Sequence, residues 1–333
     1  MAFAVGCVLG STETLRQNAY VEISGSNDVS VIDTATNKVI ATIPVGAFPL
    51  GITVTPDGHR VYIANACYGF CGYVSVIDTA TNIVIATIPV GYSPSGVAVA
   101  PDGGKVYVAN AFSGTVSVIA TGTNTVIDTV PVQEIPHFLA VTPDGRRVYV
   151  ANSYSNTVSV IETANDTVIA TIPVGSNDPS AGGSYPQGVA VSPDGSKVYV
   201  ANSYLANSVS VIDTSTNTVI DTIPVGTGPE GLAVTADGSK IYVANIWDYD
   251  VSVINAATDK VVTTVPVGVN PQAFGIFIQR PIGFAGTPGK AKCYGQSISA
   301  LTGQYHGLNA AAAALGYSSA QALQNTILAF CEA

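Results

Sequence analysis

Charged residues are scarce in this chain of 333 residues. They form 10% of the sequence, only 12 of them are Lys or Arg, and the formal net charge is −10 at pH 7. Proteins that bind nucleic acids need a basic surface to neutralise phosphates, so this composition argues against such a partner. The sequence also has no run of 18 apolar residues, which argues against a membrane-spanning helix. The low charge and the 47% of apolar residues instead favour sheets that are buried on both faces.

Side chains that bind transition metals are few as well, with 3 histidines and 5 cysteines in the chain. His59, His137 and His306 fall in different parts of the expected fold, so we predict no metal site built from histidines. A Cys-x3-Cys pair without further thiols or histidines nearby is a poor zinc site. We therefore interpret Cys67 and Cys71 as a disulfide.

The remaining cysteines and the N-terminal residues favour export. Cys293 and Cys331 bracket the C-terminal tail and are predicted to form a second disulfide, which needs an oxidising compartment. Residues 1–10 resemble the apolar core of an export signal, although no basic residue precedes them. We interpret residues 1–18 as an export-signal remnant or an N-terminal extension, and its cleavage or the lipidation of Cys7 stays open. The expected location is secreted, periplasmic or cell-surface.

A block of about 42 residues recurs along the chain, and each copy holds four short apolar runs separated by turn residues. The copies are marked by the Ser-Val-Ile segments that begin at Ser30, Ser75, Ser117, Ser159, Ser210 and Ser252. The first two runs of a copy are joined by Asp-Gly, a strong hairpin signal. The last run ends in proline, which cannot donate to a ladder and therefore marks an edge strand. This pattern predicts an all-β, six-bladed β-propeller of four-stranded antiparallel blades.

The two ends of the repeat region predict how the ring closes. The first copy begins at its second strand, near Ala19, and the last copy ends with an unmatched strand, Phe274–Ile278. We expect this C-terminal strand to pair with Ala19–Ser24 and to complete the N-terminal blade of a propeller formed by residues 19–280. A seven-bladed ring is the alternative, and it would need Phe3–Gly10 to supply a strand.

The character of the sequence changes after the propeller. Residues 281–292 form a Gly/Pro-rich linker, and residues 293–333 form an Ala-rich tail that is predicted to be helical and disulfide-linked. The apolar positions of the tail are Ile298, Leu301, Leu315, Leu323, Ile327 and Phe330. They are too many for so short a segment to bury alone, so we expect the tail to pack on the propeller.

The segments Val106–Asn110, Val148–Asn152 and Val198–Asn202 carry the motif Val-Tyr-Val-Ala-Asn. Each is followed by a Ser-Val-Ile strand and by Pro-Val, with Gly next in the second and third copies and Gln133 in the first. In these motifs the chain resembles the YVTN β-propeller repeat family over residues 19 to about 279. The resemblance implies a propeller like those of exported and surface-layer proteins. It implies, more distantly, a likeness to propellers with lactonase or lyase activity.

The loops at one end of the predicted blades differ from those at the other. They contain no Lys or Arg, whereas acidic residues occur at Asp28, Glu134, Asp178, Glu230, Asp248 and Asp250. The same loops are rich in aromatic residues, and the candidate binding residues are Tyr68, Phe70, Phe112, Tyr154, Tyr185, Tyr204, Trp247 and Tyr249, with Gln187 and Gln272 at the channel mouth. An acidic, aromatic face suits a glycan or a protein partner. The alternative is that the rings only pack over the ends of the blades.

Two ionisable residues are expected at the mouth of the central channel. His137 interrupts the repeat, and Glu230 lies two blades away, so the two are candidates for a general acid and base. We favour a non-enzymatic role: an exported binding or structural scaffold that presents the acidic, aromatic face to a glycan or protein. The alternative is a lactonase- or lyase-like enzyme with its site at the top of the channel. No cofactor is predicted, although a divalent cation held by Glu and Asn side chains fits the alternative; the oligomeric state stays open.

Overall fold

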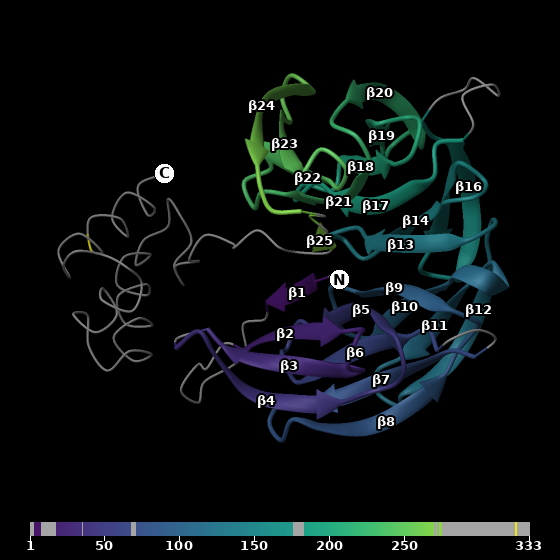
Figure 1. Cartoon of the computed structure of the whole chain (residues 1–333). Coiled ribbons are helices and arrows are strands. Elements are labelled where there is room, and N and C mark those ends of the chain that lie inside the picture. Colours follow the sequence, from purple (N-terminus) through teal and green to yellow (C-terminus); the bar gives the residue numbers. More distant parts are fainter. Residues whose placement is uncertain are drawn as a thin grey trace.

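The computed structural model describes residues 3–7, 18–34, 36–67, 71–175, 183–269, 271, 273–274 and 324. Strands make up nearly all of the regular structure in these residues, and η1 (Ala111–Ser113) is a single 3-10 turn. The strands form six sheets that stand around a common centre like the blades of a propeller (Figure 1). The sheet-forming part of the chain that the structure describes is thus all-β and propeller-like.

Each sheet consists of four antiparallel strands in chain order, and the first carries one strand more. Sheet 1 holds β1 (Phe3–Cys7), β2 (Asn18–Ile23), β3 (Asp28–Asp33) and β4 (Lys38–Pro44), with β25 (Ala273–Phe274) beside β1. Sheet 2 holds β5 (Pro49–Val54), β6 (Arg60–Asn65), β7 (Tyr73–Asp78) and β8 (Ile83–Pro89). Sheet 3 holds β9 (Pro94–Val99), β10 (Lys105–Asn110), β11 (Thr115–Ala120) and β12 (Thr125–Pro131). Sheet 4 holds β13 (Pro136–Val141), β14 (Arg147–Asn152), β15 (Thr157–Glu162) and β16 (Thr167–Pro173). Sheet 5 holds β17 (Pro186–Val191), β18 (Lys197–Asn202), β19 (Ser208–Asp213) and β20 (Thr218–Pro224), and sheet 6 holds β21 (Pro229–Val234), β22 (Lys240–Asn245), β23 (Asp250–Asn255) and β24 (Lys260–Pro266).

Local chemistry explains the strands and their turns. Between β13 and β14, Gly145 has a φ of 71°, which costs glycine little, and the neighbouring Asp144 Oδ1 accepts hydrogen bonds from Thr142 Oγ1 at 2.6 Å and from Arg146 N at 3.0 Å. The strand that ends in proline lies at the outer edge of every sheet, as the missing N–H requires. The prolines thus mark the perimeter of the molecule.

Neighbouring sheets pack through one repeated interface. Between sheets 4 and 5, Tyr149 and Val160 face Val198 and Ile212, and all four side chains are 0% exposed. The tyrosine hydroxyl also reaches across the interface, where Tyr149 Oη donates to Asn217 Oδ1 at 2.9 Å. Four further interfaces repeat this packing between successive sheets. Apolar burial on both faces of each sheet accounts for the low charge of the chain.

Basic side chains at the end of the sheets that carries the Asp-Gly hairpins also bridge these interfaces. Lys105 Nζ lies 2.7 Å from Asp166 Oδ2 of the next sheet, and Lys197 Nζ lies 2.8 Å from Asp259 Oδ2. Two arginines at the equivalent strand position donate instead to backbone oxygens of the next sheet, Arg60 to Thr121 and Arg147 to Thr214. These four cations therefore hold sheets together and are not free to form a basic surface.

The predicted closing strand is wrong. The place beside β2 is taken by the N-terminal strand β1, with Val5 opposite Val21 in antiparallel register. The C-terminal strand β25 pairs instead with β1, in parallel, with Phe3 opposite Ala273. Pairing β25 with β2 would close a loop of about 250 residues, whereas β1 needs only a short connection, and the difference in loop entropy is about 2–3 kcal/mol.

The first and last sheets are separated by β25. The innermost strands contact one another in the series β1, β5, β9, β13, β17 and β21, and β25 contacts both β21 and β1. Figure 1 shows β25 at this position, between the purple and the light green sheets. The described residues therefore form six sheets with an additional inner strand between the last and the first, and the number of blades in a closed ring stays a prediction.

Candidate functional site

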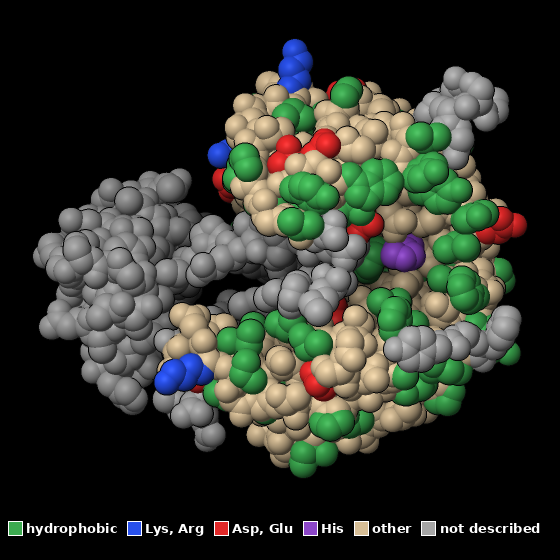
Figure 2. Space-filling model, viewed as in Figure 1, with side chains coloured by type: hydrophobic (Ala, Val, Ile, Leu, Met, Phe, Trp, Pro, Cys, Tyr) green, Lys and Arg blue, Asp and Glu red, His purple; other side chains and the backbone are tan. Residues whose placement is uncertain are grey.

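The irregular loops gather at one end of the sheets, which we call the loop face. The strand ends define it: Asn110 lies opposite Thr115, which lies opposite Pro131, so the loops after β10 and β12 share one end of the sheet. The loop face comprises the described residues of 24–27, 45–48, 66–72, 90–93, 111–114, 132–135, 153–156, 174–185, 203–207, 225–228 and 246–249. Within these described loops no Lys or Arg occurs, and in Figure 2 blue side chains appear only at the margin of the view.

Four of the predicted aromatic residues meet on the loop face, and we call them the aromatic row. The ring centroids of Tyr154 and Tyr185 are 5.5 Å apart, those of Tyr185 and Tyr204 are 5.4 Å apart, and those of Tyr204 and Trp247 are 6.2 Å apart. All three contacts are edge-to-face, the favourable geometry for aromatic pairs. The row joins loops of sheets 4, 5 and 6, which are distant in the sequence.

The rings of the row are open to solvent. Tyr154 is 58% exposed, Tyr204 50% and Trp247 48%, while Tyr185 between them is half-buried. Burial, and after it the neighbouring Tyr154 and Tyr204, raises the pKa of the Tyr185 hydroxyl, so the ring stays neutral at physiological pH. Side chains that only sealed the ends of the sheets would lie under other residues. The row instead presents aromatic surface to solvent.

The backbone beneath the row is fixed by hydrogen bonds. Asn156 Oδ1 accepts from Ser184 N at 2.6 Å and from Tyr185 N at 3.1 Å, so a turn of sheet 4 holds the loop that enters sheet 5. Tyr154 N donates to Glu134 O at 3.3 Å, and Trp247 N donates to Thr227 O at 3.2 Å. These hydrogen bonds fix the backbone positions from which the rings project.

The other predicted binding residues lie apart from the row or outside the described residues. Phe112, on η1, is 61% exposed and Tyr249 is 45% exposed, and among the described residues neither makes a ring contact with the row. Gln187 is half-buried at the start of β17. The residues outside the described part of the chain are Tyr68, Phe70 and Gln272.

The channel-mouth candidates sit at the starts of inner strands. His137 is the second residue of β13 and Glu230 the second of β21, and β17 contacts both strands and therefore lies between them. His137 Nδ1 is buried without a hydrogen-bond partner, and its ring packs edge-on against Phe138 with centroids 4.7 Å apart. Burial lowers the pKa of His137 to about 4, so the imidazole is neutral at pH 7. A neutral imidazole can accept a proton but cannot donate one as an imidazolium would.

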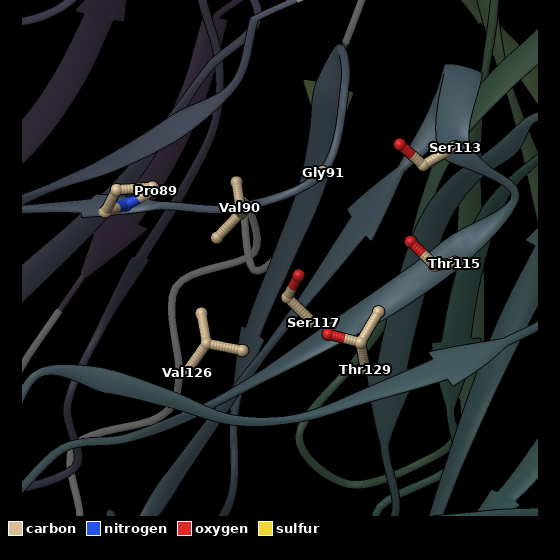
Figure 3. Close-up of a pocket in the computed structure, with 8 residues that line it drawn as sticks. All are labelled: Pro89, Val90, Gly91, Ser113, Thr115, Ser117, Val126 and Thr129. Carbon is tan, nitrogen blue, oxygen red and sulfur yellow. The ribbon is translucent and has the colours of Figure 1, made fainter.

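A pocket that the sequence did not indicate lies between sheets 2 and 3 (Figure 3). It holds about 380 Å³ and is lined by Pro89, Val90, Gly91, Ser113, Thr115, Ser117, Val126 and Thr129. Three of its hydroxyls are already engaged. Asn110 Nδ2 donates to Thr115 Oγ1 at 3.1 Å and to Ser117 Oγ at 2.9 Å, and Tyr92 N donates to Ser113 Oγ at 2.8 Å. Each lining residue belongs to the repeat, so no sequence signal distinguishes the pocket. The engaged hydroxyls make it a poorer site than the row.

Only part of the cysteine prediction concerns described residues. Cys67 and Cys71 are paired, with Cα atoms 5.8 Å apart, a usual span for a disulfide. Their oxidation in the native compartment stays a prediction, and Cys293 and Cys331 lie outside the described residues. In the part of the chain that the structure describes, no three His, Cys, Asp or Glu side chains are grouped as metal ligands. The same part contains no helix with the length and apolarity needed to cross a membrane.

Comparisons with known proteins agree with the sheet topology. Residues 179–280 match the family described as YNCE-like beta-propeller, and residues 74–169 match the family described as lactonase, 7-bladed beta-propeller. No curated protein matches the chain. Hydrazine synthase of Kuenenia stuttgartiensis is similar in structure, with a TM-score of 0.68 and 22% identity over 82% of this chain and 88% of that one.

A functionally unknown protein of Desulfotomaculum acetoxidans is also similar, with a TM-score of 0.63 and 21% identity over 80% of this chain and 87% of that one. At such low sequence identities, the similarity to these solved structures indicates the fold alone. The matched families are propellers but are not described as the YVTN repeat family, so that finer resemblance stays a prediction. The topology and the matches together identify the chain as a β-propeller.

Proposed function

We propose that this protein is an exported binding scaffold that holds a glycan or a protein partner on its loop face. The observation that carries the proposal is the aromatic row, in which four rings from three sheets form one contiguous and largely exposed strip. Exposed aromatic surface is costly in water and usually marks an interaction site. Tyrosine and tryptophan stack on the C–H faces of sugars and are enriched in the cores of protein interfaces.

The charge of the loop face narrows the class of partner. Its described loops lack Lys and Arg but carry Glu134 and Asp248 near the two ends of the row. The carboxylate of Asp248 accepts a hydrogen bond from Thr227 N at 2.6 Å, which fixes a negative charge beside Trp247. A neutral sugar or a basic protein segment therefore suits this face better than an anionic glycan. The pairing of Cys67 with Cys71 supports the proposed export to an oxidising compartment.

Replacing Tyr204 and Trp247 together by alanine is expected to weaken binding at least about tenfold, because two adjacent aromatic contacts are lost. Binding of the wild type and the variant to a glycan array and to basic surface proteins would measure the change. Tyr92, which is 48% exposed and lies in another loop of the same face, provides the matched control. If the double variant bound like the wild type while Tyr92→Ala lost binding, the row would not be the site.

A second candidate function is a lactonase-like hydrolysis at the channel mouth. The observation in its favour is that His137, whose Nδ1 has no partner, lies inside the segment that matches the lactonase family. The neutral imidazole would take a proton from the water that attacks the lactone carbonyl. We expect hydrolysis of a lactone panel to fall as the ring protonates near pH 4 and to be lost in His137→Ala. Unchanged hydrolysis in that variant would remove this candidate.

A further inference from the structure

The last sheet exposes an apolar face. The equivalent face of each other sheet is covered by the neighbouring sheet. On its outer strand β24, Val265 is 43% exposed, whereas its counterparts Ile223, Ile172 and Ile88 are each 3% exposed. The same difference recurs on the next strand inward, β23, where Val251 is half-exposed and its counterpart Val209 is 0% exposed. The compared residues occupy the same position of the repeat and are all Val or Ile. The type of residue therefore does not explain the difference in exposure. The half-exposed Tyr242 and Val251, with the exposed Val265 and Val267, form what we call the open face.

The first sheet shows the complementary half of the same interface. Ile32 of β3 is half-buried, whereas its counterparts Ile77 and Ile161 are 0% exposed. Val39 of β4 is 58% exposed, although the matching Val84 is half-buried. Both halves of one sheet-to-sheet interface are therefore left uncovered, and β25 lies between the strands that border them. The uncovered space corresponds to the position of a further sheet.

The chain itself leads into this position. Pro271 corresponds to the proline that begins the innermost strand of sheets 2 to 6, such as Pro229 and Pro186, and β25 begins two residues after it. The chain thus starts an inner strand for a seventh position. It continues through residues 275–333, but this remainder lacks the repeat that would supply three more strands.

The composition of the remainder matches an apolar surface. Residues 293–333 contain no Lys, Arg or Asp, and Glu332 is their one acidic residue. A segment that stayed solvated and unfolded would be expected to be charged and poor in apolar residues. The segment instead carries the apolar side chains Ile298, Leu301, Leu315, Leu323, Ile327 and Phe330.

We propose that residues 293–333 dock on the open face and take the place of a seventh sheet. Tyr242, Val251, Val265 and Val267 then receive the apolar side chains of this segment, as the equivalent residues of the other sheets receive Val and Ile from their neighbours. The segment is in this way a cap on the last sheet. It protects an apolar face that would otherwise associate with other chains.

Photo-cross-linking in the full-length chain tests the docking. Benzoylphenylalanine placed at Val265 is expected to give a cross-link that runs as a monomer and that maps by mass spectrometry to peptides within 293–333. Val262 is the control: it lies on the same strand and is 56% exposed, but its counterparts Ile220 and Ile127 are also exposed, at 51% and 53%. The probe at 262 is expected to give at least fivefold less of that product. A second probe at Val267 repeats the test if the first variant does not fold.

Three results would overturn the proposal. Cross-links between two chains would show that a second copy covers the face, and cross-links to peptides of 18–44 would show that sheets 1 and 6 meet directly. Equal labelling from 262 and 265 would show that the face is open. As an independent arm, Leu323→Asp with Ile327→Asp is expected to reduce the 265 cross-link severalfold without altering binding at the aromatic row.

Discussion

Replacing Gly51 by alanine is expected to lower the free energy of unfolding by about 3 kcal/mol or more, an overpacking effect at the upper end of the usual range. A Cβ at this position would lie 2.0 Å from the backbone oxygen of Ser95. Gly51 is on β5 and Ser95 is on β9, the innermost strands of neighbouring sheets, which approach one another closely. Backbone atoms of two packed strands cannot move aside as a flexible side chain can, so the strain would spread through both sheets.

Urea-induced unfolding of purified protein would measure this loss. Gly25→Ala and Gly122→Ala are matched controls, because a Cβ at either position meets no atom within 4 Å and neither glycine has a positive φ. Both controls are expected to change the free energy of unfolding by less than about 0.5 kcal/mol. If Gly51→Ala unfolded like these controls, the close approach of β5 and β9 would be wrong.

Replacing Tyr149 by alanine is expected to cost about 3–5 kcal/mol, the range measured for large aromatic side chains removed from a protein core. Tyr149 is 0% exposed between sheets 4 and 5, and its hydroxyl donates to Asn217 Oδ1 at 2.9 Å. Removing the ring leaves a cavity in that interface and deprives the asparagine of its partner. Tyr149→Phe keeps the ring and removes only the hydrogen bond, so it is expected to cost about 1 kcal/mol.

Thermal and urea unfolding of both variants would separate packing from hydrogen bonding. Tyr154→Ala is the control, since Tyr154 is 58% exposed on the loop face and contributes little to the core. It is expected to leave stability nearly unchanged and to affect binding instead. Similar losses of stability in Tyr149→Ala and Tyr154→Ala would contradict the distinction between interface and loop face.

The separation of these two effects explains how a propeller can serve as a binding scaffold. Stability comes from interfaces such as that of Tyr149, where every side chain is fixed by a neighbouring sheet. The loops contribute little to that packing, so their residues can change without unfolding the ring. Aromatic rings such as Tyr204 and Trp247 can therefore stand exposed on the loop face at small cost to the fold.

Much of the local structure was determined by the sequence alone. The repeat predicted four antiparallel strands per unit, Asp-Gly predicted the hairpins, and proline predicted the edge strand, because each of these signals acts through neighbouring residues. The concentration of aromatic residues in loops at one end was also readable, since alternating strands fix which loops share an end. These features need only local backbone geometry and hydrogen bonding.

Only the tertiary structure decided which distant residues meet. Tyr154, Tyr185, Tyr204 and Trp247 belong to different repeats, and their contacts depend on how three sheets are turned about the centre. The sequence predicted the wrong strand beside β2, because Phe3–Cys7 and Phe274–Ile278 are both short and apolar and the repeat does not distinguish them. Loop entropy favoured the nearer segment, β1, and this choice left β25 between the last and first sheets. The open face follows from that placement, since a buried interface needs two sheets in contact and no repeat pattern shows where the ring stops.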